Sequence, residues 1–341
     1  MAGIAAAQQR DGMIPWWPGG HADPWNHVEA AMALDVGGRP AAAEAAYAWL
    51  ARAQRPDGAW HQYYVTGGIE EPTLDANVTA YVATGVWHHV LITADTGFLE
   101  EMWPVVEAAV GFVLDLQTAG GEVLWARDAD GVPSSYALLT TSSSIYQSLR
   151  CAIAAAHRLG RERPEWELGA ASLSSAILTR PHAFRNKDRW AMDWYYPVLA
   201  GVLTGEAGRE RLQQGRSAFV MEGLGTRCVS DHPWITAAET CECVLAHLAA
   251  GEVEVAHRLF GWVQHLRATS GGYFTGMVHP QRAYFPVEEE ATYSAAVAIL
   301  AADALYGLTP ACRLFRGEGL PAVPPLVPEP ASAGSPGPMA R

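Results

Sequence analysis

Carboxylic acids, aromatic rings and amides cluster repeatedly along this chain at the points where helix-like runs begin. The first cluster lies within residues 23–29 and contains Asp23, Trp25, Asn26, His27 and Glu29. An aspartate before a proline is an ordinary helix N-cap. A cap does not require an aromatic ring, an amide, an imidazole and a second acid in the next two turns. We therefore interpret this cluster as part of a binding or catalytic site.

Similar clusters open later runs. Residues 231–239 repeat the first cluster in altered form, with Asp231, His232, Trp234 and Glu239. The remaining clusters contain Asp75 with Asn77, residues 140–146, Asp193 with Trp194 and Tyr195, and the triplet Glu288, Glu289 and Glu290 with Tyr293. Helix capping, the preference of acids for a helix N-terminus, or a structural hydrogen bond remains an alternative explanation for each acid taken alone.

Several carboxylates among tryptophans and tyrosines are typical of a site that cleaves glycosidic bonds. One protonated acid donates a proton to the leaving oxygen, while a carboxylate activates water or attacks the anomeric carbon. Burial or a neighbouring carboxylate must raise one pKa if acid and base are to coexist near neutral pH. We predict Asp23 and Glu239 as the catalytic pair, with Asp75 and Glu289 as reserves, and the sequence does not say which is the acid. The predicted sugar-binding side chains are Trp25, Asn26, His27, Glu29, Asn77, Trp125, Asp193, Trp194, Tyr195, Asp231, His232, Trp234, Tyr273, Glu288 and Tyr293.

The elements that must position these side chains are helices, because apolar residues recur at steps of three and four. We expect helices over residues 24–36, 40–54, 75–94, 97–117, 140–159, 164–179, 190–203, 207–220, 233–249, 252–268 and 290–306, with a weak twelfth segment near 309–316. Long loops span roughly residues 55–73, 118–139, 180–189, 221–232 and 269–289 and alternate with short turns. This pattern predicts an all-α (α/α)6 toroid, a barrel of six helix pairs, with the long loops and the site on one face.

Composition limits the domain organisation and the partners. Half of the 341 residues are hydrophobic, so one catalytic domain over residues 1–318 can bury a large core. Residues 319–341 are rich in Pro, Ala and Gly and are predicted to be disordered. The 36 acidic residues outnumber the 23 basic ones, which argues against a nucleic-acid partner. No signal segment and no membrane-spanning apolar run is apparent, so we expect a cytoplasmic location and no membrane partner.

The sequence predicts no metal and no cofactor. The five cysteines are odd in number and their spacing matches no zinc pattern, so we expect them to be buried small residues. No serine lies in a nucleophile elbow, and the glycine-rich stretches lack the spacing of a phosphate loop. The sequence leaves open whether the chain forms a homo-oligomer.

Residues 54–60, which read QRPDGAW, resemble the QW repeat of squalene-hopene cyclases and related prenyl-processing α/α barrels. The chain has one such copy. It has neither the DxDD motif that protonates a polyene nor the DDxxD motif that binds diphosphate through magnesium. A terpenoid-processing barrel remains an alternative that predicts a dry aromatic cavity, and a non-catalytic glycan-binding toroid is a second alternative.

A second resemblance covers about residues 1–310. The segment from Asp75 through residues 96–104 to residues 125–128 (WARD) is similar to the glucoamylase-type α/α-barrel glycosidases. Residues 11–16 (DGMIPW), 23–34 and 286–289 (PVEE) resemble actinobacterial proteins that are often labelled prenyltransferases and are similar to the methylmannose polysaccharide hydrolases. The resemblance implies hydrolysis of internal α-1,4-mannosidic bonds in a partly methylated polysaccharide. Because Asn26 stands where such motifs can carry a second acid, no catalytic role is assigned to it.

Toroidal glycosidases of this kind commonly invert the anomeric configuration. Inversion requires carboxyl groups roughly 6.5–9.5 Å apart, whereas a separation of about 5–5.5 Å indicates retention. The resemblance therefore implies an inverting hydrolase whose partner is an oligo- or polysaccharide.

Overall fold

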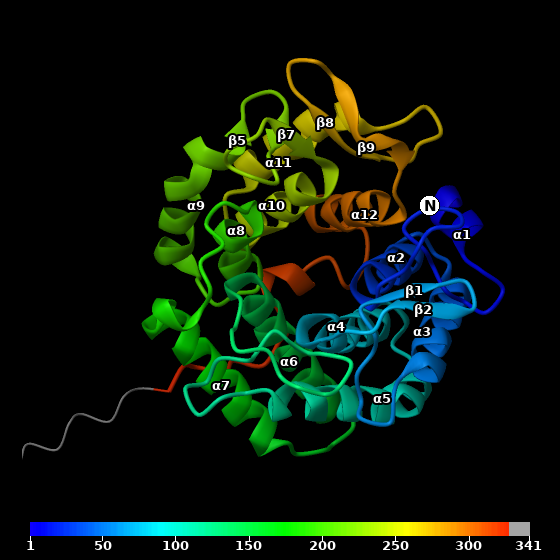
Figure 1. Cartoon of the computed structure of the whole chain (residues 1–341), viewed down its shortest axis with the longest axis vertical. Coiled ribbons are helices and arrows are strands. Elements are labelled where there is room, and N and C mark those ends of the chain that lie inside the picture. The colour runs from blue at the N-terminus through cyan, green and yellow to red at the C-terminus, as the bar shows by residue number, and fades with distance from the viewer. Residues whose placement is uncertain (327–341) are drawn as a thin grey trace, which may run out of the picture.

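The computed structural model describes residues 1–326 and is mostly helical (Figure 1). Its α-helices are α1 (Ala2–Ala7), α2 (Pro24–Val36), α3 (Pro40–Ala53), α4 (Ala76–Thr93), α5 (Thr96–Asp115), α6 (Leu139–Arg158), α7 (Pro164–Thr179), α8 (Ala191–Leu199), α9 (Gly205–Phe219), α10 (Ala237–Ala249), α11 (Val253–Val263) and α12 (Thr292–Tyr306). The eleven strongly periodic runs are all helices in the structure. The weak segment near 309–316 contains only a 3-10 turn at Leu314–Arg316, and α1 was not predicted.

The helices form an inner and an outer set. The inner helices α2, α4, α6, α8, α10 and α12 contact one another in that order, and α12 also contacts α2. The helices α3, α5, α7, α9 and α11 each pack against the inner helix that precedes them in the chain, and lie around the periphery (Figure 1). Short α1 lies against α12 and α2. The N-termini of the inner helices, where the acidic clusters occur, are thereby brought towards a common end.

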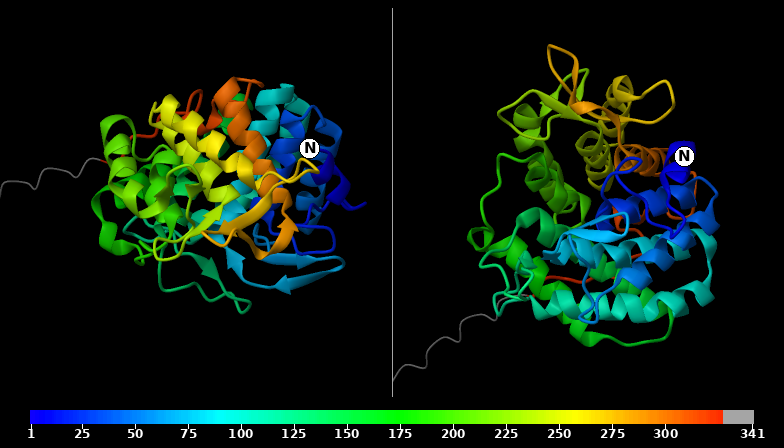
Figure 2. Two further views of the ribbon diagram at one scale, coloured as in Figure 1. Left: turned by 90° about the horizontal axis from the view of Figure 1, so that it is seen from above. Right: turned by 45° about the vertical axis from the view of Figure 1, so that its right-hand side comes forward.

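Short strands occupy the long connections between helix pairs. They are β1 (Tyr63–Val65), β2 (Gly68–Glu71), β3 (Leu74–Asp75), β4 (Ala126–Arg127), β5 (Val220–Met221), β6 (Gly225–Thr226), β7 (Trp234–Thr236), β8 (Phe274–Val278) and β9 (Ala283–Glu290). The pairings between these strands are antiparallel: β1 with β2, β3 with β4, and β5 with β6, while β8 pairs with both β7 and β9 in a three-stranded sheet. The strands gather at one end of the helices (Figure 2).

Two predicted helices begin later than expected because strand pairing takes their first residues. The run predicted over 233–249 starts as β7, which pairs with β8, and becomes helical at Ala237. The run predicted over 290–306 becomes helical at Thr292. The triplet Glu288, Glu289 and Glu290 therefore ends strand β9 and does not open a helix.

Acidic caps define several helix starts. Asp95 precedes α5, and its Oδ1 accepts a hydrogen bond of 3.0 Å from the backbone N–H of Phe98. Asp23 and Asp75 cap α2 and α4 in the same way. A cap of this kind satisfies one of the backbone donors that the first helical turn leaves without a partner.

We expect Asp95→Ala to lower the free energy of unfolding by about 1 kcal/mol, because the Phe98 N–H loses its acceptor. Urea denaturation measures the change. Glu100→Ala, at an exposed position of the same helix, is the matched control and should shift the free energy by less than ~0.5 kcal/mol. Equal effects of the two substitutions would contradict the capping role.

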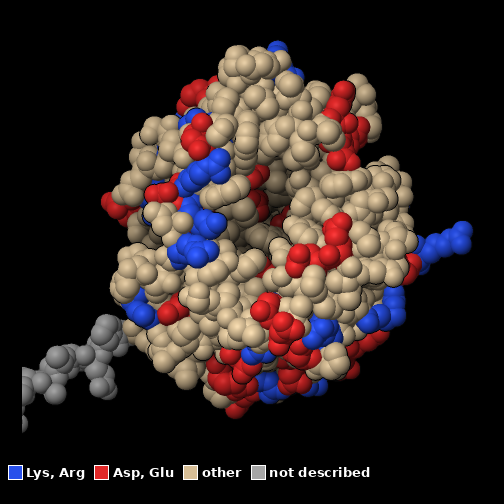
Figure 3. Space-filling view, in the orientation of Figure 1, with Lys and Arg blue, Asp and Glu red and all other residues tan. Residues whose placement is uncertain are grey.

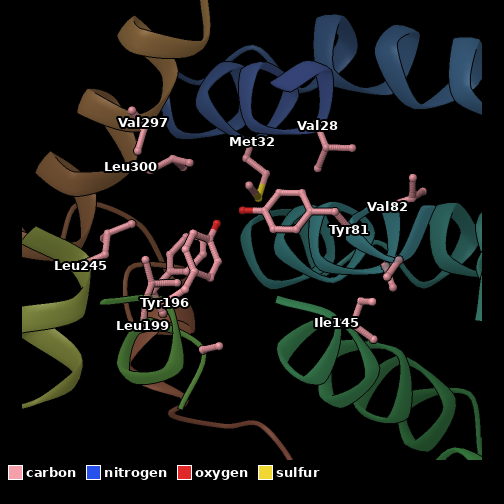
Figure 4. Close-up of a cluster of buried hydrophobic side chains, with 14 of the residues drawn as sticks. Val28, Met32, Tyr81, Val82, Ile145, Tyr196, Leu199, Leu245, Val297 and Leu300 are labelled. Carbon is pink, nitrogen blue, oxygen red and sulfur yellow. The ribbon is translucent and has the colours of Figure 1, made fainter. Parts of the chain in front are cut away.

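The interior holds many large aromatic side chains. Trp60, Trp103, Tyr47, Tyr81 and Tyr196 are among the largest fully buried residues. Figure 4 shows Tyr81 from α4 and Tyr196 from α8 extending towards the middle of the inner helices, among aliphatic side chains of α2, α6, α10 and α12. No helix in residues 1–326 is long and apolar enough to cross a bilayer.

The segment after residue 318 begins in contact with the helices. The Tyr146 hydroxyl donates a hydrogen bond of 3.1 Å to the carbonyl of Val323, and Arg150 Nε donates one of 3.0 Å to the carbonyl of Pro321. Pro321 and Val323, which we expected to belong to a disordered tail, therefore contact α6. The rest of that predicted tail, 327–341, lies outside the described residues.

Candidate active site

A cavity of about 540 Å³ opens at the strand-bearing end of the inner helices, and acidic side chains are visible within the central hollow (Figure 3). We call it the carboxylate cavity. It is lined by Trp16, Asp23, Trp25, Asn26, Glu29, Gln62, Tyr63, Asp75, Val78, Trp190, Met192, Cys228, Thr236, Ala238, Glu239, Glu242, Thr275, Phe285 and Tyr293. Five carboxylic acids thus face one hollow with several aromatic rings.

Asp23 is held by donors on both oxygens. Its Oδ1 accepts from the Asn26 backbone N–H at 3.0 Å, and its Oδ2 accepts from Asn26 Nδ2 at 2.7 Å and Trp16 Nε1 at 2.6 Å. Burial raises the pKa of Asp23, and these hydrogen bonds oppose the shift. Donors that converge on a carboxylate favour its ionised form.

Glu239 and Asp75 reach the same cavity from other elements. Glu239 lies in the first turn of α10, where burial raises its pKa and the hydroxyl of Thr236 opposes the shift. Asp75 caps α4, and its Oδ1 accepts from the backbone N–H groups of Asn77 at 2.8 Å and Val78 at 3.0 Å. Burial raises the pKa of Asp75 to about 6, because its effect is larger than the opposing effect of those hydrogen bonds.

Glu29 also lines the cavity, between aromatic donors. Trp25 Nε1 donates to Glu29 Oε1 at 3.1 Å, and the Tyr81 hydroxyl donates to the same oxygen at 3.3 Å. Burial raises the pKa of Glu29 to about 8, against those two hydrogen bonds. The negative charge of Asp23 raises the pKa further.

Glu242 is the cavity carboxylate that the sequence analysis did not identify. It accepts hydrogen bonds from the hydroxyls of Tyr195 and Tyr196, the latter at 3.2 Å. Burial raises its pKa well above the usual value, and the nearby charge of Glu29 adds to the shift. The spacing of Glu239 and Glu242 could have revealed it, because residues three apart share one face of a helix.

Aromatic rings form much of the remaining wall. The Trp16 ring lies edge-on to Tyr293 with centroids 5.0 Å apart, and edge-on to Tyr63 at 5.8 Å. Trp25 lies edge-on to Tyr196 at 5.8 Å, and Trp190 stands half-exposed at the rim. Trp16 was recognised only as part of a resemblance motif, since it lies in an irregular segment with no periodicity to mark it.

Of the predicted site residues, Asp23, Glu239, Asp75, Trp25, Asn26, Glu29 and Tyr293 line the cavity. The others do not, and several have structural partners. His27 is fully buried, accepting from the Ile14 N–H at 3.0 Å and donating to the Ala46 carbonyl at 3.0 Å. Tyr273 donates to Gln264 Oε1 at 2.8 Å.

Other predicted residues lie close behind the lining. Tyr195 reaches it through its hydrogen bond to Glu242. Trp125 stacks on Tyr136 with centroids 5.6 Å apart, and a hydrogen bond from its indole opposes the burial-driven rise in the pKa of Asp75. Asn77 is buried in the first turn of α4.

A third group lies in other surroundings. Asp193 accepts from the Thr140 hydroxyl at 2.5 Å and, with Trp194, lines a separate hollow beside α9. Asp231 is exposed, and hydrogen bonds from Arg189 and His232 hold its pKa at about 2.

The aromatic member of that loop cluster, Trp234, packs on Phe285, which lines the cavity. Glu288 and Glu289 line a different groove, beyond β9.

Cysteines and metal-ligating residues form no evident centre in the described part of the chain. Cys151, Cys228, Cys241 and Cys243 are buried and Cys312 is partly buried, and all five are free thiols. Within residues 1–326 no group of three His, Cys, Asp or Glu side chains is arranged to hold a metal ion.

The chain was compared with protein-family models and with known proteins. No protein-family model matches it. An MMP endo-(1,4)-3-O-methyl-alpha-D-mannosidase of Mycolicibacterium hassiacum is 51% identical over 318 residues, which are 93% of this chain and 88% of that protein.

Solved structures share the fold at low sequence identity. A glycosidase matches with a TM-score of 0.70 and 15% identity, over 90% of this chain and 95% of that one. A GH63 mannosylglycerate hydrolase from Thermus thermophilus matches with a TM-score of 0.67 and 12% identity, over 87% and 97%. These matches show a mostly helical fold common to glycosidases, and the 51% identity along nearly the whole chain shows that this protein belongs to the MMP endo-(1,4)-3-O-methyl-α-D-mannosidase family.

Proposed function

We propose that the protein is an endo-acting glycoside hydrolase that cleaves internal α-1,4-mannosidic bonds in a mannose polysaccharide carrying 3-O-methyl groups. The observation that carries the proposal is the 51% identity to a protein of that activity over 93% of the chain. The carboxylate cavity supports it with acids and aromatic rings in one hollow. Proton transfer and water activation by two carboxyl groups need no further reactive group.

We further propose that the helices close into an (α/α)6 toroid. Contact between α12 and α2, the last and first inner helices, supports closure. A closed ring would place Asp23 at the start of α2 and Glu239 at the start of α10 around one opening, although the two residues lie far apart in the sequence.

For the reaction itself we propose Glu239 as the general acid and Asp23 as the general base. Three donors converge on the Asp23 carboxylate, which supports an ionised group able to take a proton from water. Burial raises the pKa of Glu239, against a hydrogen bond from the Thr236 hydroxyl and one from the backbone of Glu239 itself. The direction of this shift favours the protonated form, which could donate a proton to the leaving oxygen. Asp75 is retained as a reserve, and we propose that the reaction inverts.

The aromatic walls support a methylated substrate. Rings of Trp16, Trp25 and Tyr293 present apolar surface on which the apolar face of a sugar and its methyl group can pack. Gln62 and Thr275 supply polar groups for the remaining hydroxyls.

We expect incubation with α-1,4-linked mannooligosaccharides, plain and 3-O-methylated, to yield shorter oligomers from internal cuts. Mass spectrometry identifies the products. Proton NMR of the first product should show the β-anomer if the reaction inverts. Cleavage of α-glucosides alone would contradict the mannosidase assignment. Stabilisation by a prenyl diphosphate with magnesium, and no cleavage of any glycoside, would favour the terpenoid alternative.

A further inference from the structure

A second hollow shares a wall with the carboxylate cavity. It has a volume of about 1120 Å³ and lies between α1, residues 267–272 and strand β9. We call it the β9 groove. Figure 1 shows β8 and β9 at the edge of the molecule, near the N-terminal helix α1.

The strands β8 and β9 form the shared wall. Thr275 and Phe285 face the carboxylate cavity, whereas their chain neighbours Phe274 and Tyr284 face the groove. This division follows from strand geometry, because successive side chains point to opposite faces. The two hollows are therefore separated here by a sheet one layer thick.

Two other segments divide in the same way. Trp16 lines the carboxylate cavity and Trp17 lines the groove, with ring centroids 6.0 Å apart. Tyr293 lines the cavity, while Thr292 lines the groove. The groove and the cavity thus lie on opposite faces of a common wall along three separate parts of the chain.

The groove is lined by aromatic rings and charged side chains, the kinds of group that bind sugars. Phe274 and Tyr284 stack with centroids 3.9 Å apart and remain partly exposed, forming an aromatic platform. Glu288 and Arg267 are exposed and line the same groove. Rings pack on the apolar face of a sugar, and charged side chains exchange hydrogen bonds with its hydroxyls.

The loop at residues 270–272 packs closely against the carboxylate of Glu290 in the groove. Glu290 accepts a hydrogen bond from the Ser270 hydroxyl. A Cβ at Gly272 would clash with a Glu290 carboxylate oxygen, so a side chain there would displace the acid. The geometry leaves Glu290 bound to the loop and Glu288 free to meet a ligand.

We propose that the β9 groove binds the continuation of the polysaccharide chain, outside the cavity in which the bond is cut. This inference rests on the proposed function, because an enzyme that cuts internal bonds must accommodate sugar residues on both sides of the cleavage point. A neutral glycan is not repelled by the three consecutive glutamates, whereas an anionic polymer would be. The 3-O-methyl groups named for the relative would add apolar contact with the aromatic platform.

The test compares substrates of two lengths. We expect Tyr284→Ala to lower kcat/KM on the long 3-O-methylmannose polysaccharide by about tenfold, mainly through KM, because a central aromatic contact is removed. Hydrolysis of the shortest oligosaccharide that is cleaved should change less than about twofold, since it would not reach the groove. Glu288→Ala, at an exposed position, should show the same length dependence to a smaller degree.

Tyr306→Ala is the matched control, because Tyr306 is an exposed aromatic residue at the end of α12 that lines neither hollow. Equal losses on long and short substrates, or no loss on either in both groove variants, would overturn the inference and leave the proposed function intact. If the wild-type protein cleaves no mannoside, the proposed function fails. Calorimetric titration of the long polysaccharide into wild type and Tyr284→Ala then tests the groove separately, and equal affinities would overturn it.

Discussion

Asp23→Asn and Glu239→Gln are each expected to lower kcat on methylmannose oligosaccharides by about 10²–10⁴-fold. Both substitutions keep the shape of the side chain and remove its capacity to exchange a proton. In Asp23→Asn the new amide oxygen can still accept the hydrogen bond from Trp16, so the wall of the cavity should remain in place. Binding of an uncleaved oligosaccharide, measured by calorimetry, should change by less than about tenfold.

Different rescue experiments separate the two proposed roles. If Glu239 is the acid, Glu239→Gln should recover most on an aryl mannoside whose leaving group needs no proton. If Asp23 is the base, azide should partly restore turnover in a small variant, Asp23→Ala, by replacing the activated water. The reverse pattern would exchange the two assignments.

Asp231→Asn is the matched control for the charge change, because Asp231 is exposed and paired with Arg189 away from the cavity. It should retain nearly full activity. A kcat above about a tenth of the wild-type value in both Asp23→Asn and Glu239→Gln would contradict the proposed pair and leave Asp75 as the next candidate.

The buried carboxyls Glu29 and Glu242 are expected to make the protein less stable as pH rises. Burial raises the pKa of both above the ordinary glutamate value, to about 8 for Glu29. A group whose pKa is higher in the folded state contributes stability below its unfolded pKa and loses it as pH rises through the folded pKa. The contribution of these two carboxyls to the free energy of unfolding should therefore fall between about pH 4.5 and pH 8, by on the order of a few kcal/mol. Buried His27 and His88, whose pKa values burial lowers to about 4 and about 3, act in the opposite direction below about pH 6.5.

Glu29→Gln tests this directly, because glutamine keeps the shape and cannot ionise. Urea denaturation should show that the free energy of unfolding falls less, from pH 5.5 to pH 8, in this variant than in the wild type. Glu242→Gln should act in the same direction, and the double variant should not add the two effects, since each charge influences the other. Glu100→Gln, on the surface of α5, is the control. An unchanged pH difference in both single variants would show that the pair is not protonated in the folded protein.

Much of the helical framework was accessible from the sequence, because helix periodicity and capping are local properties. The apolar spacing in residues 24–36 and 164–179 predicted α2 and α7 to the residue. Asp23, followed by proline, caps α2 as its position suggested. Where a non-local partner competed, the prediction was wrong at the boundary, as at residues 234–236, which pair with β8 instead of starting α10.

The composition of the cavity depended on tertiary structure. Trp25 and Asn26 face the cavity while the next residue, His27, is buried in the packing against α3, because each helical residue turns the side chain by about a quarter of a revolution. Asp231 belongs to a convincing cluster by spacing, yet its loop holds it against Arg189 on the surface.

The sequence by itself determined that this protein is helical, that acids and aromatic rings begin its inner helices, and that its motifs resemble a mannosidase family. Only the tertiary structure brought Glu29 of α2 and Glu242 of α10 into one hollow and assigned Glu288 to a separate groove. The physical reason is range: helix formation depends on neighbours a few residues apart. Which face of each helix meets the others depends on the packing of the whole chain, which no short stretch of sequence contains.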